Sequence, residues 1–458
     1  MMLPEKFKAR MMALLGDEYE KFERALIEVP SKRGIRVNPI KTSDEDICEE
    51  LKIPEAKIPY VKGAYFLPDG YEGIGLTPSH HAGRIYVQDP GAMATAASVT
   101  VEPDFFVADL CAAPGGKSTQ AASYLGEGGF ILSNEYVPKR AKMLVGNFER
   151  MGIRCGMVTS LDTAKLRELF DSFFDLVIAD APCSGEGMFR KDVPAIEEWS
   201  EENVKLCAER QRDILRNGAD MVKSGGVLVY STCTYSLEEN EMIIDAFLSE
   251  RDDFSIVDTP EAIKCATADG IVFDGAKHGD ELKLCRRFYP HISDGEGQFI
   301  AVLKRTGGSE PQVNFKDSAK PLSRDEKAAV DTFLRENLTD TPKGRIVKVG
   351  EQIYIIEHNA PIPPYGVFCP GVLLGEVRGK LLFPSHQFFS AYGNLFVRQE
   401  NITDESFAKS YLKGEEIDAK SFSQSGFCSV LWRGSPLGGG KASGGKIKNH
   451  YPKGLRNK

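Results

Sequence analysis

The 458-residue chain lacks any run of about 18 apolar residues free of charge, the length that a membrane-spanning helix needs. We therefore expect no membrane partner. Its start, MMLPEKFKARMMALLGDEYE, also lacks the apolar segment and the small-residue cleavage site of a secretory signal. Together these absences predict a cytoplasmic protein.

Paired cysteines are missing as well, because no two of the ten cysteines form a C-x-x-C pair and none has a histidine at zinc spacing. This pattern argues against a disulfide framework and against structural zinc, so we expect no bound metal. The cysteines are scattered along the chain at positions 48, 111, 155, 183, 207, 233, 265, 285, 369 and 428.

The chain has no overall excess of basic residues, since its formal net charge is -9. The two parts of the chain differ, however: residues 1–305 carry 36 basic and 50 acidic groups, whereas residues 306–458 carry 21 and 16. The last 18 residues, KASGGKIKNHYPKGLRNK, hold six basic residues and no acid. This segment is either a solvated tail or a contact to nucleic acid phosphates.

What the chain does contain is alternation between short β-rich apolar runs and longer amphipathic segments. This pattern predicts an α/β fold with a doubly wound, mostly parallel sheet that binds ligands at the carboxyl ends of its strands. GQFIAVLKR at 297–305 could add an edge strand. The predicted strands are residues 105–110, 129–135, 155–160, 174–182 and 225–232.

Changes in composition divide the chain into four segments. A small α+β module, predicted to recognise RNA, occupies residues 1–75, and the sheet domain occupies 76–305. The polar, Gly- and Pro-containing stretch at 306–325 is typical of a linker. Short turn-bounded strands in 326–458 predict a compact, mostly β domain.

The stretch DLCAAPGGKST, residues 109–119, places a tight glycine turn between a buried strand and a helix. Glycines at such a turn let a ligand approach the backbone. Gly116, Lys117 and Ser118 match the end of a phosphate loop, but Cys111 stands where that loop requires its first glycine. The turn therefore favours a nucleoside over a nucleotide triphosphate.

Carboxylates and cysteines follow the predicted strands. Glu135, Asp162 and Asp180 each lie at or just after a strand end, where they could bind a ribose or a base, or simply cap a helix. Cys183 and Cys233 follow neighbouring predicted strands. A doubly wound sheet would bring both thiols to one crevice.

The motifs DLCAAPGGKST, DAPCSGEG and YSTCTYSLEENE, in this order and spacing, resemble the Sun (Fmu) family of S-adenosylmethionine-dependent RNA cytosine-C5 methyltransferases. The resemblance covers roughly residues 25–305 and implies a Rossmann-like S-adenosylmethionine-dependent methyltransferase domain. GVLLGEVRGKLLFPSH and LGGGKASGGKIKNHYPKGLR resemble the PUA-like tail of the RsmF/YebU branch, which modifies 16S ribosomal RNA. In this branch's L-G-x-G-K pattern the chain has Gly439 where an aromatic residue is expected.

The resemblance also implies the roles of individual residues. Cys233 is the thiol that attacks cytosine C6, Cys183 assists release of the methylated RNA, and Asp180 contacts the N3/N4 edge of the base; Cys183 as the nucleophile is the alternative. The residues expected to bind S-adenosylmethionine are Cys111, Ala112, Ala113, Pro114, Gly115, Gly116, Lys117, Glu135, Arg140, Asp162 and Asp180.

The resemblance further predicts that the protein methylates 16S RNA or the 30S subunit, and a monomer is our default expectation. A transfer RNA substrate and a catalytically idle ribosome assembly factor are the alternatives. Because the target base must leave its stack, we expect a groove flanked by basic and aromatic side chains. Candidates for that groove are Arg33, Arg36, Phe189, Arg190 and Lys191. For His291, a structural hydrogen bond is the simplest role.

Overall fold

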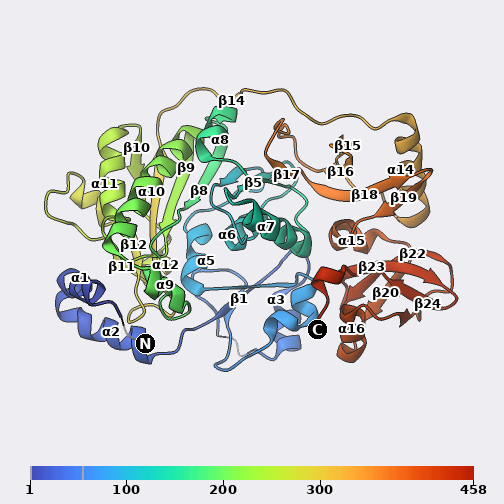
Figure 1. Cartoon of the computed structure of the whole chain (residues 1–458), viewed down its shortest axis with the longest axis horizontal. Helices are drawn as coiled ribbons and strands as arrows, with labels where there is room; N and C mark the ends of the chain where they lie inside the picture. The colour runs from blue at the N-terminus through green and yellow to red at the C-terminus, as the bar shows by residue number, and fades with distance from the viewer. Residues whose placement is uncertain (1–2, 54–55, 458) are drawn as a thin grey trace.

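The computed structural model describes residues 3–53 and 56–457 (Figure 1). Its N-terminal part contains helices and a three-stranded antiparallel sheet in the order β2-β1-β3, so this sheet extends past the predicted boundary at residue 75. The elements are α1 (Glu5–Leu15), α2 (Tyr19–Glu28), β1 (Gly34–Val37), α3 (Asp44–Leu51), β2 (Ala64–Phe66), α4 (Pro78–His81), β3 (Ile85–Gln88) and α5 (Pro90–Ala97).

A large mixed sheet forms the centre of the molecule, with the strand order β11-β12-β13-β9-β8-β4-β5-β6-β17 and β10 paired to β13. Its five middle strands, β9 to β6 in this order, run parallel, which confirms the predicted doubly wound fold. These strands are β4 (Phe106–Asp109), β5 (Phe130–Asn134), β6 (Gly156–Thr159), β8 (Phe174–Asp180) and β9 (Val222–Thr232).

The strand predicted at 297–305 is present but not at the edge. β13 (Gln298–Arg305) lies between β9 and β12, and pairs antiparallel with both. The prediction of an edge strand was wrong because it did not include β12 as a strand. β12 contains Arg286 and Arg287, two basic residues whose burial requires partners elsewhere in the fold. The strands beyond β13 are β10 (Phe254–Ile256), β11 (Ala268–Asp269) and β12 (Arg286–Phe288).

Helices cover both faces of this sheet (Figure 1). Helices α5, α6 and α7 pack together on one face, and α8, α10 and α11 pack together on the other. Their apolar sides bury the sheet in a single core. The remaining helices of this region are α6 (Gly116–Ala122), α7 (Pro138–Met151), α8 (Thr163–Leu169), α9 (Val193–Glu198), α10 (Glu201–Met221), α11 (Glu241–Glu250), α12 (Glu261–Lys264) and α13 (Gly279–Leu282).

The segment at 306–325, predicted as a linker, is docked on the sheet domain. Within it, β14 (Gln312–Val313) pairs with β7 (Phe170–Asp171), and the ring of Phe315 packs against Phe170 at 5.2 Å between centroids. The polar composition predicts a connection between domains here. It did not reveal that the connection is anchored by an aromatic residue.

The C-terminal part contains a four-stranded and a five-stranded sheet, consistent with the predicted mostly β character. One of its strands, β17 (Val367–Cys369), instead pairs with β6 and extends the central sheet. No helix within the described residues is both long and apolar enough to cross a membrane. The elements are α14 (Arg324–Asn337), β15 (Arg345–Val349), β16 (Gln352–Ile356), β18 (Val372–Arg378), β19 (Leu381–Pro384), α15 (His386–Tyr392), β20 (Gln399–Ile402), α16 (Glu405–Lys413), β21 (Ile417–Asp418), β22 (Gly426–Trp432), β23 (Ser435–Ser443) and β24 (Lys446–Asn449).

Candidate active site

The two cysteines expected to meet do meet. Cys183 follows β8 and Cys233 follows β9, the neighbouring parallel strand, and their sulfur atoms lie 3.1 Å apart. Both residues are partly exposed, and the Cys233 amide donates to the Cys183 sulfur at 3.3 Å. The pKa of Cys183 is raised well above that of a free thiol, mainly by the contact with Cys233 and also by burial. Cys183 therefore stays protonated at neutral pH.

Asp180, at the end of β8, is held by three donors. Lys117 Nζ lies 2.8 Å from Asp180 Oδ2, while Ser231 Oγ and Gln298 Nε2 donate to Oδ1 at 2.7 and 3.4 Å. Burial alone would lower the pKa of Lys117, but the charge and hydrogen bond of Asp180 outweigh burial and raise it. Lys117, expected to bind the cofactor, is therefore a charged partner of Asp180.

A cavity of about 1050 Å³ opens beside the ends of β4, β5 and β6. Of the residues expected to bind the cofactor, Cys111, Glu135, Arg140 and Asp162 line it, and its wall reaches Pro182, next to Cys183. Glu135 is 3% exposed, and its Oε2 atom has no hydrogen-bond partner among the described residues, although the Arg140 guanidinium lies 3.2 Å away. A buried acceptor without a donor fits a ligand that carries hydroxyl groups.

The glycine turn lies between β4 and α6. Gly115 has a φ of +114°, and a Cβ atom there would lie 2.9 Å from a methyl group of Leu144. Two arginines bind the turn's carbonyl oxygens: Arg140 donates to Ala113 at 2.9 Å and Arg36 to Gly116 at 3.1 Å. The expected residues Ala112, Pro114 and Gly116 are thus part of a rigid backbone turn adjoining Cys111.

Asp162 both caps a helix and lines the cavity. It is the N-cap of α8, where its carboxylate accepts from the Ala164 amide at 2.9 Å, and it also lines the cavity. The capping role and the ligand-binding role do not exclude each other, because the cap uses only one of the two carboxylate oxygens.

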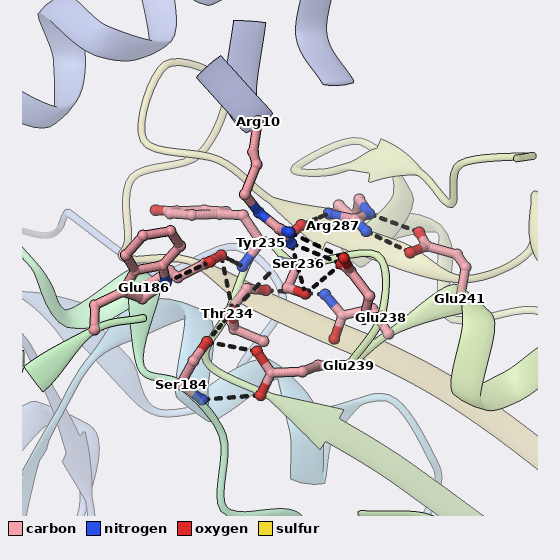
Figure 2. Close-up of polar contacts among 12 residues, drawn as sticks. Arg10, Ser184, Glu186, Thr234, Tyr235, Ser236, Glu238, Glu239, Glu241 and Arg287 are labelled. Carbon is pink, nitrogen blue, oxygen red and sulfur yellow. Dashed lines mark hydrogen bonds and ion pairs between the residues drawn. The ribbon is translucent and has the colours of Figure 1, made fainter. Parts of the chain in front are cut away.

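Sequence reasoning missed two buried glutamates that connect the cysteine loops (Figure 2). Glu186, from the Cys183 loop, accepts from Thr234 Oγ1 and from the Tyr235 amide, both at 2.9 Å. Glu239, which follows Cys233, accepts from the Ser184 amide at 2.8 Å. Both glutamates stand inside the motifs DAPCSGEG and YSTCTYSLEENE, but only the fold shows that each one reaches the other loop.

The N-terminal helices pack directly against these loops. Phe7 of α1 contacts Phe189 at 5.0 Å between ring centroids, and Phe22 of α2 contacts Tyr235 at 5.1 Å. Figure 2 shows Arg10 of α1 reaching the loop after Cys233, where its guanidinium binds both carboxylate oxygens of Glu238 at 2.9 and 2.7 Å.

Three residues predicted to flank an RNA groove are buried instead, so this prediction was wrong for them. Phe189 is 1% exposed, Arg36 is buried against the glycine turn, and Arg190 pairs with Glu296 at 2.7 Å. Lys191 is exposed, and its ammonium group pairs with Asp89 at 2.9 Å. A local pattern of basic residues cannot show whether distant acids and carbonyls neutralise and bury them.

Of the predicted groove residues, Arg33 is exposed, although its guanidinium contacts the Tyr71 carbonyl. His291 has the structural contact that was expected, with Nε2 lying 3.4 Å from Glu18 of the N-terminal helices. Its ring also packs on Phe22, at 5.8 Å between centroids.

The basic C-terminal segment is folded rather than a loose tail. Lys441, on β23, lies opposite Lys448, on β24, and both side chains are exposed. Lys446 is exposed too, at the start of β24. Lys458, the last basic residue of the predicted tail, lies outside the described residues.

Comparison with known proteins agrees with this geometry. Residues 3–90 match the family model of the N-terminal domain of 16S rRNA methyltransferase RsmF, residues 97–304 match 16S rRNA methyltransferase RsmB/F, and residues 401–457 match the methyltransferase RsmF PUA domain. The central match contains both cysteine loops and the glycine turn.

Similar proteins span the whole chain. Ribosomal RNA small subunit methyltransferase F of Klebsiella pneumoniae is 30% identical over 472 residues, covering 99% of this chain and 96% of the relative. The protein of the same name from Aeromonas salmonicida is 28% identical over 490 residues, covering 99% and 97%.

Solved structures share the fold. A methyltransferase homolog protein from Pyrococcus horikoshii is 28% identical, covers 66% of this chain and 95% of its own, and has a TM-score of 0.58. NSun6 from the same organism, solved with SFG, is 22% identical, covers 66% and 98%, and has a TM-score of 0.57. The chain is an RNA methyltransferase and belongs to the family of ribosomal RNA small subunit methyltransferase F.

Proposed function

We propose that this enzyme methylates C5 of a cytosine in 16S ribosomal RNA, using S-adenosylmethionine and a temporary bond between Cys233 and C6 of the base. The observation that carries the proposal is the pair of cysteine sulfurs 3.1 Å apart beside Asp180 and the cavity. Cytosine C5 is a poor nucleophile, and addition of a thiol at C6 is a chemically sound way to activate it.

The cavity residues fit S-adenosylmethionine, which when bound supplies the methyl group. Glu135, whose buried Oε2 accepts no hydrogen bond from the described residues, would bind the ribose hydroxyls. Asp162 would bind the adenine amine, and the backbone from Cys111 to Lys117 would hold the ribose and the methionine part. Arg140, which pairs with Glu135 and binds the Ala113 carbonyl, would keep both in place.

We assign Cys233 as the nucleophile from the family resemblance of its motif. Contact with Cys233 and burial raise the pKa of Cys183, which fits Cys183 acting as a thiol during release. The Cys233 sulfur gives up its proton and forms a bond to C6, and the electron pair of the C5–C6 double bond shifts toward C5, which becomes nucleophilic. Asp180, bound to Lys117, hydrogen-bonds the N3/N4 edge and favours protonation of the ring. After methylation, C5 loses its proton to water, the electron pair of that bond restores the C5–C6 double bond, and the C6–sulfur bond breaks with its electron pair returning to Cys233. Cys183 assists this release of the RNA.

A ribosomal substrate is favoured by the whole-chain similarity to small-subunit RNA methyltransferases and by the RsmF-type PUA domain. Transfer RNA is the competing substrate for the same chemistry. We expect the monomer to bind a loop or opened helix of the RNA, because the cytosine must leave its stack to reach both sulfurs.

The test incubates the protein with methyl-labelled S-adenosylmethionine and, in parallel, unmodified 16S RNA, 30S subunits and total transfer RNA, followed by nucleoside analysis. Label in 5-methylcytosine from a ribosomal substrate supports the proposal. Label only in transfer RNA overturns the substrate, and no label overturns the activity. Cys233→Ala should abolish turnover but keep cofactor binding, whereas Cys183→Ala should accumulate a covalent RNA adduct on a denaturing gel.

A further inference from the structure

The two cysteine loops are connected by a row of four buried oxygen atoms. The row runs from Glu239 Oε2 through Ser184 Oγ and Thr234 Oγ1 to Glu186 Oε2. Ser184 directly follows Cys183, and Thr234 directly follows Cys233. The central link, 3.0 Å between the two hydroxyl oxygens, is therefore one residue away from the sulfur pair on each side.

Counting protons shows that this row needs one more than its hydroxyl groups contain. Three oxygen–oxygen links require three bridging protons, but Ser184 and Thr234 have one hydroxyl proton each. If both carboxyl groups were ionised, each hydroxyl would donate to its own glutamate. The 3.0 Å link between the hydroxyls would then hold no proton.

The remaining contacts indicate which glutamate carries the third proton. Glu186 is suited to be the carboxylate, because it also accepts from Trp199 Nε1 and the Tyr235 amide, both at 2.9 Å. Glu239 Oε2 contacts only the Ser184 hydroxyl in the described residues, while Oε1 accepts from the Ser184 amide and Gln211. With the proton on Glu239 Oε2, all three hydrogen bonds point the same way, from Glu239 to Glu186.

We propose that Glu239, Ser184, Thr234 and Glu186 form a proton-sharing chain that positions the two cysteines for the reaction. The proposal deepens the proposed function and rests on it. None of the four residues needs to touch the RNA, because they act through the backbone of the residues beside Cys183 and Cys233. They are positioning residues. When Glu239 carries the third proton, all three hydrogen bonds form and connect the two cysteine loops.

The surroundings of the chain favour one negative charge over two. Neither Glu186 nor Glu239 has an ion-pair partner within the part of the chain that the structure describes, and both are buried. Burial raises the pKa of Glu239 to about 7, although the Ser184 hydroxyl and amide oppose the rise. The titratable or charged groups that face the pair in the described residues are Arg10 of α1, Cys183, Cys207 of α10, Tyr230, Tyr235 and Tyr289.

The same substitution should preserve the chain at one end and break it at the other. In Glu239→Gln the amide nitrogen can donate to Ser184 Oγ, as the protonated acid does, and the amide oxygen can still accept from the Ser184 amide. In Glu186→Gln one amide nitrogen must face a donor, either the Thr234 hydroxyl with the Tyr235 amide or Trp199. Glutamine therefore imitates the protonated form at 239 and breaks the chain at 186.

A second pair of variants tests the centre of the chain. Thr234→Val keeps the shape of the side chain but removes its hydroxyl, which leaves both the Ser184 link and the Glu186 link unmade. Thr234→Ser restores the hydroxyl and is the matched control. Thr234→Ser loses the γ-methyl group but keeps the hydroxyl, whereas Thr234→Val keeps the shape but loses the hydroxyl, so a larger effect of valine than of serine reports the hydrogen bonds and not a loss of packing.

The positions of the sulfurs can be measured without RNA or cofactor. Diamide oxidises the two thiols to a disulfide: the sulfurs lose two protons and two electrons, which reduce the N=N bond of diamide to a hydrazine. The rate is followed by mass spectrometry of the linked Cys183 and Cys233 peptides. At pH 6.5 we expect Glu186→Gln and Thr234→Val to form the disulfide roughly tenfold more slowly, the effect of losing a hydrogen bond to a buried charge. Glu239→Gln and Thr234→Ser should stay near the wild-type rate.

Turnover adds a readout that a purely structural role would not move. In the wild type kcat should fall as the pH rises through about 7 and the chain loses its third proton, and Glu239→Gln should shift that fall to higher pH. Equal slowing by the two glutamine variants, or equal rates for Thr234→Val and Thr234→Ser, overturns the chain. If the wild type makes no 5-methylcytosine, the proposed function fails, but the order of disulfide rates still decides the inference.

Discussion

Arg287 offers a strong test of how the Cys233 loop is supported. Its guanidinium donates to Glu241 through Nε at 2.6 Å and through Nη2, to the Tyr235 carbonyl at 2.8 Å and to the Tyr289 hydroxyl at 3.1 Å. Its side chain is 2% exposed and that of Glu241 is 0% exposed. Figure 2 shows this pair beside the loop that carries Thr234 and Ser236.

Replacing Arg287 with methionine keeps much of the volume and leaves Glu241 as a buried charge without its cation. Among the described residues, only the Ile271 amide, at 2.9 Å, would still donate to that carboxylate, and the Tyr235 carbonyl would lose its guanidinium donor. Loss of one partner of a buried ion pair costs about 3–5 kcal/mol. We expect Arg287→Met to lower the free energy of unfolding of the methyltransferase region by that amount.

Urea denaturation followed by intrinsic fluorescence measures the change, with Glu241→Gln/Arg287→Met as the control. The double variant removes both charges, so it should recover part of the loss, and a double-mutant cycle then gives the coupling energy of the pair. A loss below about 1 kcal/mol for Arg287→Met would refute the reasoning. So would a double variant whose loss equals the sum of the two single losses.

Two further predictions concern pH and salt. Burial raises the pKa of Asp109 to about 7, although the hydrogen bond from Ser118 opposes the rise. The protonated Asp109 should therefore contribute at most about 4 kcal/mol to stability. This contribution should be fully present below about pH 4 and lost as the pH rises through about 7. Asp109→Asn should flatten this part of the stability curve, and an unchanged curve in urea titrations would contradict the assignment. Replacing Lys441, Lys446 and Lys448 with alanine should reduce the slope of log affinity for RNA against log salt by about 2, measured by fluorescence anisotropy; an unchanged slope would show that this strand pair does not contact phosphates.

The parts of the fold that the sequence predicts are those controlled by local pattern. The apolar runs around Val107, Ile131 and Val177 identify central strands because buried parallel strands are apolar on both faces. The meeting of Cys183 and Cys233 follows from the same topology, since both lie just beyond the carboxyl ends of neighbouring parallel strands. Local chemistry and strand order were sufficient for this part of the site.

What the sequence could not predict depends on partners far along the chain. Arg36 is surface-like by composition, yet it is buried because a carbonyl at residue 116 and a hydroxyl at residue 119 accept its hydrogen bonds. Arg287 enters a strand for the same reason, through a glutamate 46 residues away. The reciprocal contacts of Glu186 and Glu239 are equally invisible, because their partners belong to the opposite loop.

The pairing of β17 with β6 has a consequence for protein synthesis. Until Val367–Cys369 has left the ribosome, the backbone groups of Gly156–Thr159 on that side remain an open sheet edge. Some two hundred residues separate the two strands, so at about 5–20 residues per second the edge stays uncovered for on the order of ten seconds or more. Open edges invite pairing with other chains. A fragment ending at the methyltransferase region should therefore aggregate, and the C-terminal part protects the nascent enzyme as well as extending it.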